Sequence, residues 1–367
     1  MTFSFSSSFR LGPSRRTAGL IPAVILAAGC AAESDSSASL ADLPVWTYDS
    51  TMVFPGDASL LRPEDGVVLA DGRLIVGDQE HGLRLVEPDG SSRPFGNLGG
   101  AGYRHSPPAH GGGANGVFLE PGGSHVLVAD VFGAAIYRVD VVSGETEKLY
   151  QHRYGINAAI RDSRGTIWFT QSARNTPEEG EAPLWEAVDI PRPEGAVYRI
   201  PMQGGRLAPE PELVLDSLVF PNGIALDEAG RHLFVSEMLA GRIMRYRVDP
   251  GTGALADRTV MVDSVVADNL ELDGNGNLWA ALPLTNEILV VSLASGARRS
   301  VFRSTNPEQE RVAAEFIRRG AAGVTRLELF TPSVWAPLPG PITGIIVGRE
   351  GPVYAATLGN ALLRLPR

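Results

Sequence analysis

One short unit recurs six times along the chain, and each copy contains a run of apolar residues of the kind that forms a buried strand. The runs lie at residues 74–78, 126–130, 167–171, 233–237, 278–282 and 353–357. A turn that contains glycine precedes every run, as a β-hairpin requires, and an alternating strand follows most of them. A repeat of this kind predicts a ring or array of similar strand-rich units.

The ends of successive runs are 41 to 75 residues apart, an irregular period around that of a four-stranded propeller blade. We therefore predict an all-β fold, a six-bladed β-propeller over residues 45–367 with four-stranded blades around a central metal-binding channel. Residues 45–54 have the pattern of a strand but no unit of their own. We expect them to complete the last blade, which would close the ring and remove exposed sheet edges.

Two insertions account for the irregular period. Residues 173–194 are rich in Pro and Glu, and residues 305–321 have the pattern of a helix with Val312, Phe316 and Ile317 on one face. Both insertions leave from corresponding ends of their units. They are therefore expected to cover one face of the disc as a partial lid.

A polar residue stands thirteen to fifteen positions before the end of every apolar run. These residues are Glu64, Asn115, Asn157, Asn222, the pair Asp268 and Asn269, and Thr343. Asn-Gly and Asp-Asn are also common turn formers, but turn formation does not explain a polar residue in all six units. Because the innermost strand of each blade begins near the central channel, the six positions should converge there. Their oxygen atoms suit a hard cation, Ca²⁺ above all, with Mg²⁺ and Mn²⁺ as alternatives.

The first thirty residues are typical of an export signal. Arg10, Arg15 and Arg16 precede an apolar stretch that is too short to span a bilayer as a mature helix. The only cysteine ends the sequence Leu26-Ala27-Ala28-Gly29-Cys30, which is similar to the bacterial lipobox, where the cysteine is lipidated.

We accordingly predict a signal peptide over residues 1–29 and a flexible, lipid-anchored tether over residues 30–44. The protein would then be an exported lipoprotein of the periplasm or the cell surface, anchored through Cys30. A plain secretory signal with an incidental cysteine, and hence a secreted protein, is the alternative.

The formal net charge of −10 is unfavourable for binding phosphate backbones, which requires clustered Lys and Arg. We therefore expect no nucleic-acid partner. A small-molecule substrate, membrane contact only through the lipid anchor, and a monomeric state are expected.

Two segments carry a resemblance to a known superfamily. They are Pro221-Asn222-Gly223-Ile224-Ala225-Leu226 and Asp268-Asn269-Leu270-Glu271-Leu272-Asp273, each of which leads into one of the apolar runs. Over most of residues 45–367 the chain resembles the calcium-dependent propellers of senescence marker protein/gluconolactonase, paraoxonase and diisopropyl fluorophosphatase, with strictosidine synthase as a relative. This resemblance implies that the ligands of a catalytic calcium are Glu64, Asn157, Asn222, Asp268 and Asn269.

The chain also departs from that superfamily. Asn115 stands where paraoxonase has the histidine discussed as a base, so the resemblance implies no mechanism driven by that histidine. A second, structural calcium of the superfamily needs acidic residues beside two ligands; Asp65 meets this need and Ala158 does not. His105 and His110 precede Asn115 in a glycine-rich stretch. One of them could serve as a proton shuttle, although histidines in such loops are more commonly solvated.

These features predict a metal-dependent hydrolase of lactones or esters, in which the metal polarises the carbonyl and a ligand carboxylate activates water. Asp268 is expected to orient or deprotonate the water, with Glu64 as the second choice. Asn115 is expected to hydrogen-bond the substrate or to complete the metal's shell. Two alternatives stay open: a non-hydrolytic lyase or isomerase of the same fold, and a surface-anchored binding propeller with a structural ion.

Overall fold

The computed structural model describes residues 40–105, 112–348 and 351–366. Contacts divide the chain in two, and all the described residues belong to the second unit, residues 37–367. The predicted signal peptide, Cys30 and most of the predicted tether lie outside the described residues. No helix in the described part of the chain is long and apolar enough to cross a membrane.

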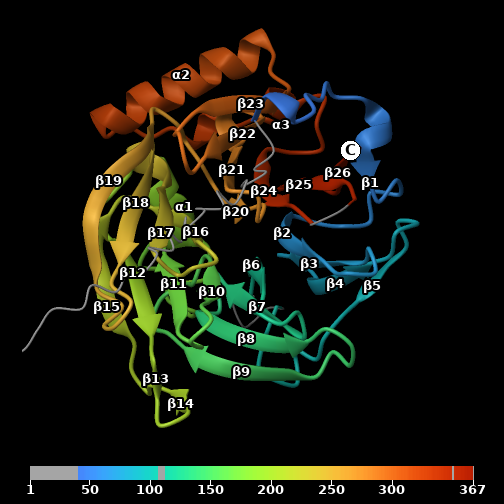
Figure 1. The fold of residues 1–367 in the computed structure, drawn as a ribbon. Helices are drawn as coiled ribbons and strands as arrows, with labels where there is room; N and C mark the ends of the chain where they lie inside the picture. Colours follow the sequence, from blue (N-terminus) through green and yellow to red (C-terminus); the bar gives the residue numbers. More distant parts are fainter. Residues whose placement is uncertain (1–39, 106–111, 349–350, 367) are drawn as a thin grey trace, which may run out of the picture. The chain divides into compact units, whose positions relative to one another are not determined.

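Six four-stranded antiparallel sheets form the second unit and are arranged around a common centre as the blades of a propeller (Figure 1). In chain order the blades are β2 (Pro63–Val68), β3 (Leu74–Asp78), β4 (Gly82–Val86) and β5 (Ser92–Pro94); β6 (Ala114–Leu119), β7 (His125–Asp130), β8 (Ala135–Asp140) and β9 (Thr146–Gln151); β10 (Ala159–Arg161), β11 (Ile167–Gln171), β12 (Gly195–Ile200) and β15 (Glu212–Leu218); β16 (Pro221–Leu226), β17 (His232–Glu237), β18 (Arg242–Val248) and β19 (Leu255–Asp263); β20 (Leu270–Leu272), β21 (Asn277–Leu282), β22 (Glu287–Ser292) and β23 (Arg298–Arg303); and β24 (Ile342–Ile346), β25 (Val353–Thr357), β26 (Leu362–Leu365) and β1 (Val53–Phe54). A separate hairpin, β13 (Met202–Gln203) and β14 (Arg206–Leu207), extends from the third blade.

The innermost strands form a closed ring. Strand β2 contacts β6, β6 contacts β10, β10 contacts β16, β16 contacts β20, β20 contacts β24, and β24 contacts β2. The six apolar runs of the sequence are the second strands of the blades, β3, β7, β11, β17, β21 and β25. The predicted six-bladed fold is thus confirmed, and the hairpin glycines, for example Gly72 and Gly165, both with φ of 87°, have the positive φ that such turns need.

The core lies between neighbouring blades rather than in one central layer. Trp279 and Val290 of the fifth blade pack against Ile345 and Leu363 of the sixth. Each sheet buries both faces in this way, which explains why the second strands are almost continuously apolar. The centre of the ring is left to the polar residues at the starts of the inner strands.

The N-terminal segment closes the ring, as predicted, but with a shorter strand. Val53 pairs with Leu363 and Phe54 with Leu362, so β1 is the outermost strand of the sixth blade. The preceding residues do not continue the strand, because Ser50–Met52 form a 3₁₀ turn. Trp46 instead makes an isolated bridge to Phe302 of the fifth blade, so that the segment joins the last two blades.

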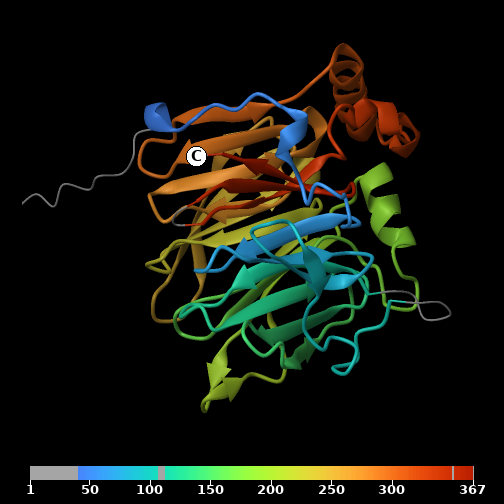
Figure 2. The same ribbon diagram turned by 90° about the vertical axis from the view of Figure 1, so that its right-hand side faces the viewer.

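Both insertions carry helices on the same face of the propeller. In Figure 2 the green helix α1 (Ala182–Asp189) and the orange helix α2 (Pro307–Ala322) lie on one side of the blades, together with α3 (Pro332–Trp335). Residues of α1 and α2 belong to one apolar cluster. The predicted partial lid is therefore present.

The face that α2 turns to the propeller differs in part from the predicted one. Gln309, Ala313 and Phe316 are buried, and Val312 is half-buried, but Ile317 is 55% exposed. The prediction that Ile317 shares the buried face was wrong, since the packed stripe runs through Ala313 and Phe316 and leaves the next position at its solvent edge.

Closure of the ring through β1 predicts a large cost for truncating Phe54, which is 7% exposed and packs its ring against Tyr354 at 5.6 Å between centroids. Phe54→Ala should lower the free energy of unfolding by about 3 kcal/mol, measured by urea denaturation. The matched variant Val142→Ala, at a position that is 84% exposed, should change it by less than about 0.5 kcal/mol. Equal effects of the two changes would contradict the role given to β1.

Candidate metal centre

The polar register of the six units lies where the inner strands begin, and in four blades the strand pairing shifts there. The shifts fall between Pro63 and Asp65, Ala114 and Val117, Pro221 and Ile224, and Ile342 and Gly344. A bulge of this kind inserts an unpaired residue and re-aims its side chain. The residues so released include Glu64, Asn115, Asn222 and Thr343. In the other two blades Asn157 and the pair Asp268 and Asn269 come just before β10 and β20.

All seven residues of the register are buried, with exposed fractions between 1% and 6%. Hydrogen bonds connect five of them across blade boundaries. Nδ2 of Asn269 donates to Oε1 of Glu64 at 2.9 Å. Nδ2 of Asn115 donates to the carbonyl of Asn157 at 3.0 Å and lies 3.4 Å from its Oδ1. Oγ1 of Thr343 donates to the carbonyl of Glu64 at 3.2 Å. The structure thus brings the predicted residues together at the centre of the ring.

Three oxygen atoms of this group are buried and have no hydrogen-bond partner: Oε2 of Glu64, Oδ1 of Asn222 and Oδ1 of Asp268. An unsatisfied buried oxygen is costly, and a bound ion is one of the few explanations for several at one place. Carboxylate and amide oxygens are the ligands that hard divalent cations prefer. The described residues contain no cluster of three or more His, Cys, Asp and Glu side chains suited to a metal, so an ion at this place would depend on the amide oxygens as well as on the two carboxylates.

Burial raises the pKa of both carboxyl groups. The pKa of Glu64 is raised well above its usual value by burial first, then by the charges of Asp268 and Asp65, and a hydrogen bond from Asn269 acts in the opposite direction. Burial, and then the charge of Asp65, raise the pKa of Asp268 to about 8. Burial likewise raises the pKa of Asp65 to about 7. A cation among these groups would stabilise their charged forms.

Asn115 is held by the protein on both sides of its amide. Its Oδ1 accepts a hydrogen bond from Nε2 of Gln79 at 2.6 Å, and its Nδ2 donates to Asn157. The side chain therefore fixes the position of Asn157. Gln79, which is 5% exposed, was not found by the sequence reasoning, although it directly follows the first apolar run.

Hydroxyl groups that the sequence reasoning also missed support the backbone of the register. Oγ1 of Thr170 donates to the carbonyl of Asn222 at 2.7 Å, and Oγ of Ser172 donates to the carbonyl of Pro221 at 2.7 Å. Oγ of Ser236 donates to the carbonyl of Ala267. Each lies at or near the end of a second strand and braces the start of the next blade. A hydroxyl residue at or near the end of the second strand is the feature of the sequence that could have indicated these contacts.

Glycine follows several register residues because neighbouring blades approach each other closely. Gly223 and Gly344 do not have positive φ and belong to strands, so they are not turn residues. A Cβ atom on Gly223 would lie 2.5 Å from the amide nitrogen of Leu270, and one on Gly344 would lie 2.6 Å from the carbonyl oxygen of Glu64. The Asn-Gly and Thr-Gly pairs therefore place a polar side chain beside a blade contact.

An apolar roof, formed by the lid and the nearby loops, lies over the starts of the inner strands. Leu184 and Val188 of α1 and Phe316 of α2 pack with Phe132 and Phe220. Phe220 directly precedes β16, so the roof lies beside Asn222, whose Nδ2 is 3.6 Å from the sulfur of Met238 at the roof's edge.

Arg326 joins the two helices of this roof. Its Nε donates to the carbonyl of Val188 at 2.8 Å and its Nη1 to the carbonyl of Phe316 at 3.1 Å. The guanidinium lies 3.6 Å from the centre of the Phe316 ring. Helices α1 and α2 are thus fastened to each other as well as to the propeller.

The histidines of the glycine-rich stretch contribute less. His105 has Nδ1 at 2.6 Å from the carbonyl of Gly112 and Nε2 at 3.3 Å from Glu80, and His110 lies outside the described residues. The side chain of His105 is held by these two partners, neither of which belongs to the register.

The close blade contact predicts that Gly223→Ala destabilises the protein. The added methyl group has to displace the backbone of β20, which should cost about 1–3 kcal/mol of unfolding free energy. Gly56→Ala is the matched control, because nothing lies within 4 Å of a Cβ at that position; there the change should be neutral or stabilising by up to about 1 kcal/mol. Urea denaturation of both variants tests this, and equal stability would contradict the contact.

The raised carboxyl pKa values predict that the metal-free protein loses stability as pH rises. The pKa of Asp268 is about 8 in the folded chain against an ordinary 3.8, so between these values the folded state holds more protons than the unfolded state. We choose pH 7.5 to 9, because His152, whose pKa burial lowers from 6.5 to about 4, is then almost entirely neutral in the unfolded state as well as in the folded state. In chelator the melting temperature should fall across this window.

Asp268→Asn has no proton to lose and should show a shallower fall, and added Ca²⁺ should flatten the fall in the unaltered protein. Glu145→Gln, at an exposed turn of the second blade, should keep the original slope. A slope in Asp268→Asn equal to that of the unaltered protein would contradict the assignment.

Comparison with known proteins shows a family to which this chain is similar. Residues 104–307, more than half of the chain, match the family described as SMP-30/Gluconolactonase/LRE-like region. A curated relative, the adipocyte plasma membrane-associated protein of Gallus gallus, is 27% identical over 168 residues, which are 43% of this chain and 39% of that protein. The chain thus spans about two fifths of the length of the curated relative that it matches.

Solved structures show the same fold at low sequence identity. A gluconolactonase from Xanthomonas campestris superimposes with a TM-score of 0.58 at 18% identity, covering 89% of this chain and 95% of that one. The calcium-binding protein regucalcin from Agrobacterium tumefaciens superimposes with a TM-score of 0.54 at 14% identity, covering 85% of this chain and 86% of the other. Together with the family match and the six blades described above, these likenesses lead to one conclusion: this chain belongs to the SMP-30/gluconolactonase/LRE-like family.

Proposed function

We propose that this protein is a metal-dependent hydrolase of lactones or esters, with Ca²⁺ as its metal and Mg²⁺ or Mn²⁺ as alternatives. The observation that carries the proposal is the convergence of three buried, unpartnered oxygens, from Glu64, Asn222 and Asp268, at the centre of the ring. Asn157 and Asn269 would complete the ligand set. The names of two proteins with this fold, a gluconolactonase and a calcium-binding regucalcin, support the same reaction class and the same metal.

A cation held by these residues would polarise a substrate carbonyl and stabilise the oxyanion that develops on it. Asp268 is the residue best suited to orient a water molecule and take its proton, because it is a carboxylate and one of its oxygens has no protein partner. Glu64 is the second choice, since its Oε1 already accepts a hydrogen bond from Asn269. Asn115, held by Gln79, keeps Asn157 in place.

The apolar roof supplies the second requirement of such a site, which is a dry environment. Phe132, Phe220, Val188 and Phe316 are buried in one apolar cluster at this end of the ring and would limit the access of bulk water. Electrostatic stabilisation of a developing oxyanion is stronger where water is excluded.

We also propose that the protein acts outside the cytoplasm. The support is the sequence of the first thirty residues, with its three arginines, its short apolar stretch and the lipobox-like segment that ends in Cys30. Acylation of Cys30 would hold the propeller at a membrane surface through the tether. Mass spectrometry of the mature N-terminus, with and without a Cys30→Ser change, tests this.

Loss of the metal ligands should abolish hydrolysis. A chelator should reduce turnover of a lactone and aryl-ester panel by at least a hundredfold, and Ca²⁺ should restore it, since removing one element of oxyanion stabilisation alone costs about 10²–10³ in kcat. Asp268→Asn and Glu64→Gln should each lower kcat by about a hundredfold or more, whereas Glu145→Gln should leave it unchanged.

The same experiment separates the competing classes. Full hydrolytic activity in chelator would contradict the proposal. Conversion of a carbonyl compound without hydrolysis would indicate a lyase or isomerase. If no compound is turned over and metal removal lowers only the melting temperature, the ion is structural and the protein is a binding propeller.

A further inference from the structure

A second chamber lies in the channel, on the side of the metal centre away from the lid. It has a volume of about 480 Å³, a size typical of small-molecule sites. Its lining comes from the inner strands β6, β10, β16 and β20, from the turns that follow the first three of them, and from Asp65 of β2, whereas the candidate metal centre and the roof lie at the starts of the inner strands. The chamber and the lid therefore lie at opposite ends of the channel.

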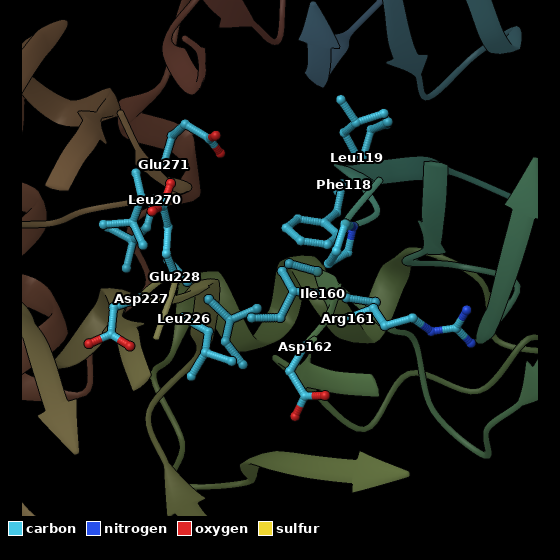
Figure 3. Close-up of a pocket in the computed structure, with 18 of the residues that line it drawn as sticks. Phe118, Leu119, Ile160, Arg161, Asp162, Leu226, Asp227, Glu228, Leu270 and Glu271 are labelled. Carbon is cyan, nitrogen blue, oxygen red and sulfur yellow. The ribbon is translucent and has the colours of Figure 1, made fainter. Parts of the chain in front are cut away.

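Apolar side chains form the walls of the chamber. Figure 3 shows Phe118, Ile160, Leu226 and Leu270 around the same open space. None of these side chains can form a hydrogen bond, so they suit the carbon skeleton of an organic molecule.

Two carboxylates, Asp65 and Glu271, lie at the inner end of the chamber. The Glu271 side chain reaches into the open space (Figure 3). The Asp65 carboxylate accepts a hydrogen bond from the amide of Val117 at 3.0 Å. No ion pair joins either carboxylate to a cationic side chain of the described residues.

The charges near the chamber do not balance. Arg161 is the only cationic side chain among the lining residues, and it is paired with Glu120 at 2.7 Å. A divalent cation at the metal centre would be matched by the carboxylates of Glu64 and Asp268. Asp65 and Glu271 then still lack a counter-charge. The mouth adds Asp162, Asp227 and Glu228 to the negative potential.

We propose that this chamber binds a small organic cation, an ammonium group carried by an apolar chain or ring, with the cation at Glu271 and Asp65 and the apolar part against Phe118, Ile160 and Leu226. An inorganic divalent ion needs six to eight oxygen ligands, and the walls here are carbon. An ammonium group needs only a few acceptors and leaves the rest of the molecule to the apolar walls. This site goes beyond the proposed hydrolase and does not depend on it.

Isothermal titration calorimetry of the metal-loaded full-length protein tests the proposal, with n-hexylammonium as the probe and hexanol and hexanoate as matched neutral and anionic compounds. Hexylammonium should bind with a stoichiometry of one and at least about tenfold more tightly than hexanol. Glu271→Gln should weaken its binding about tenfold or more, because it removes one charge and keeps the shape. Glu145→Gln, the same change on the outside of the second blade, should have no effect.

A chamber-filling variant, Leu226→Trp, keeps the test decisive if Glu271→Gln fails to fold; it should abolish binding of hexylammonium while the melting curve stays cooperative. Equal binding of hexylammonium and hexanol, or unchanged binding in both variants, would overturn the proposal. It would also be overturned if a second equivalent of Ca²⁺ displaces the amine from the unaltered protein, since the site would then belong to an inorganic ion. None of these readouts measures hydrolysis, so the outcome is separate from that of the proposed function.

Discussion

The close contact between the inner strands of neighbouring blades is the constraint on which the rest of the structure depends. The amide of Gly116 donates to the carbonyl of Asn157, that of Gly223 to Asp268, and that of Asn269 to Thr343. These bonds pass from one blade to the next at the height of the polar register, and glycine is needed where a side chain would meet the adjacent backbone. These contacts hold the starts of the inner strands close together where the candidate ligands lie.

Much of this was predictable because a propeller repeats one local pattern. Each unit carries its own strand periodicity and turn, so six independent copies agree on the fold even where one is interrupted by an insertion. The same repetition located the whole polar register at the centre of the ring, because a position that is equivalent in every blade must return to the same radius, whereas the choice of ligands within it came from the resemblance. The sequence alone did not show that Gly223 and Gly344 allow neighbouring blades to approach each other. It did indicate that turn formation does not fully explain the Asn-Gly and Thr-Gly pairs.

What could not be predicted depends on contacts between blades rather than on the pattern within one. Gln79 donates a hydrogen bond to Asn115 of the next blade, and Thr170 donates one to the carbonyl of Asn222, also in the next blade. The repeat period of the sequence does not show which side chains meet across a blade boundary. The exposed position of Ile317 has the same cause, since helix periodicity identifies an apolar stripe but not the line along which the propeller meets it. Strand β1 is short because Trp46 pairs with Phe302 of the fifth blade, so the residues before Val53 do not continue along the sixth blade.

The two ends of the channel are linked by the strands that line both. Glu64 and Asp65 are consecutive, and the shift in strand pairing at this point allows one carboxylate to belong to the candidate metal centre while the other lines the chamber. Asn269 and Glu271 are two residues apart near the start of β20 and stand on the same side of that strand. Burial raises the pKa of Glu64, Asp268 and Glu271, and the charge of Asp65 raises it further in all three. A cation at either end therefore stabilises the charged form of its own pair and, through the Coulomb interaction across the few residues between them, of the other pair as well.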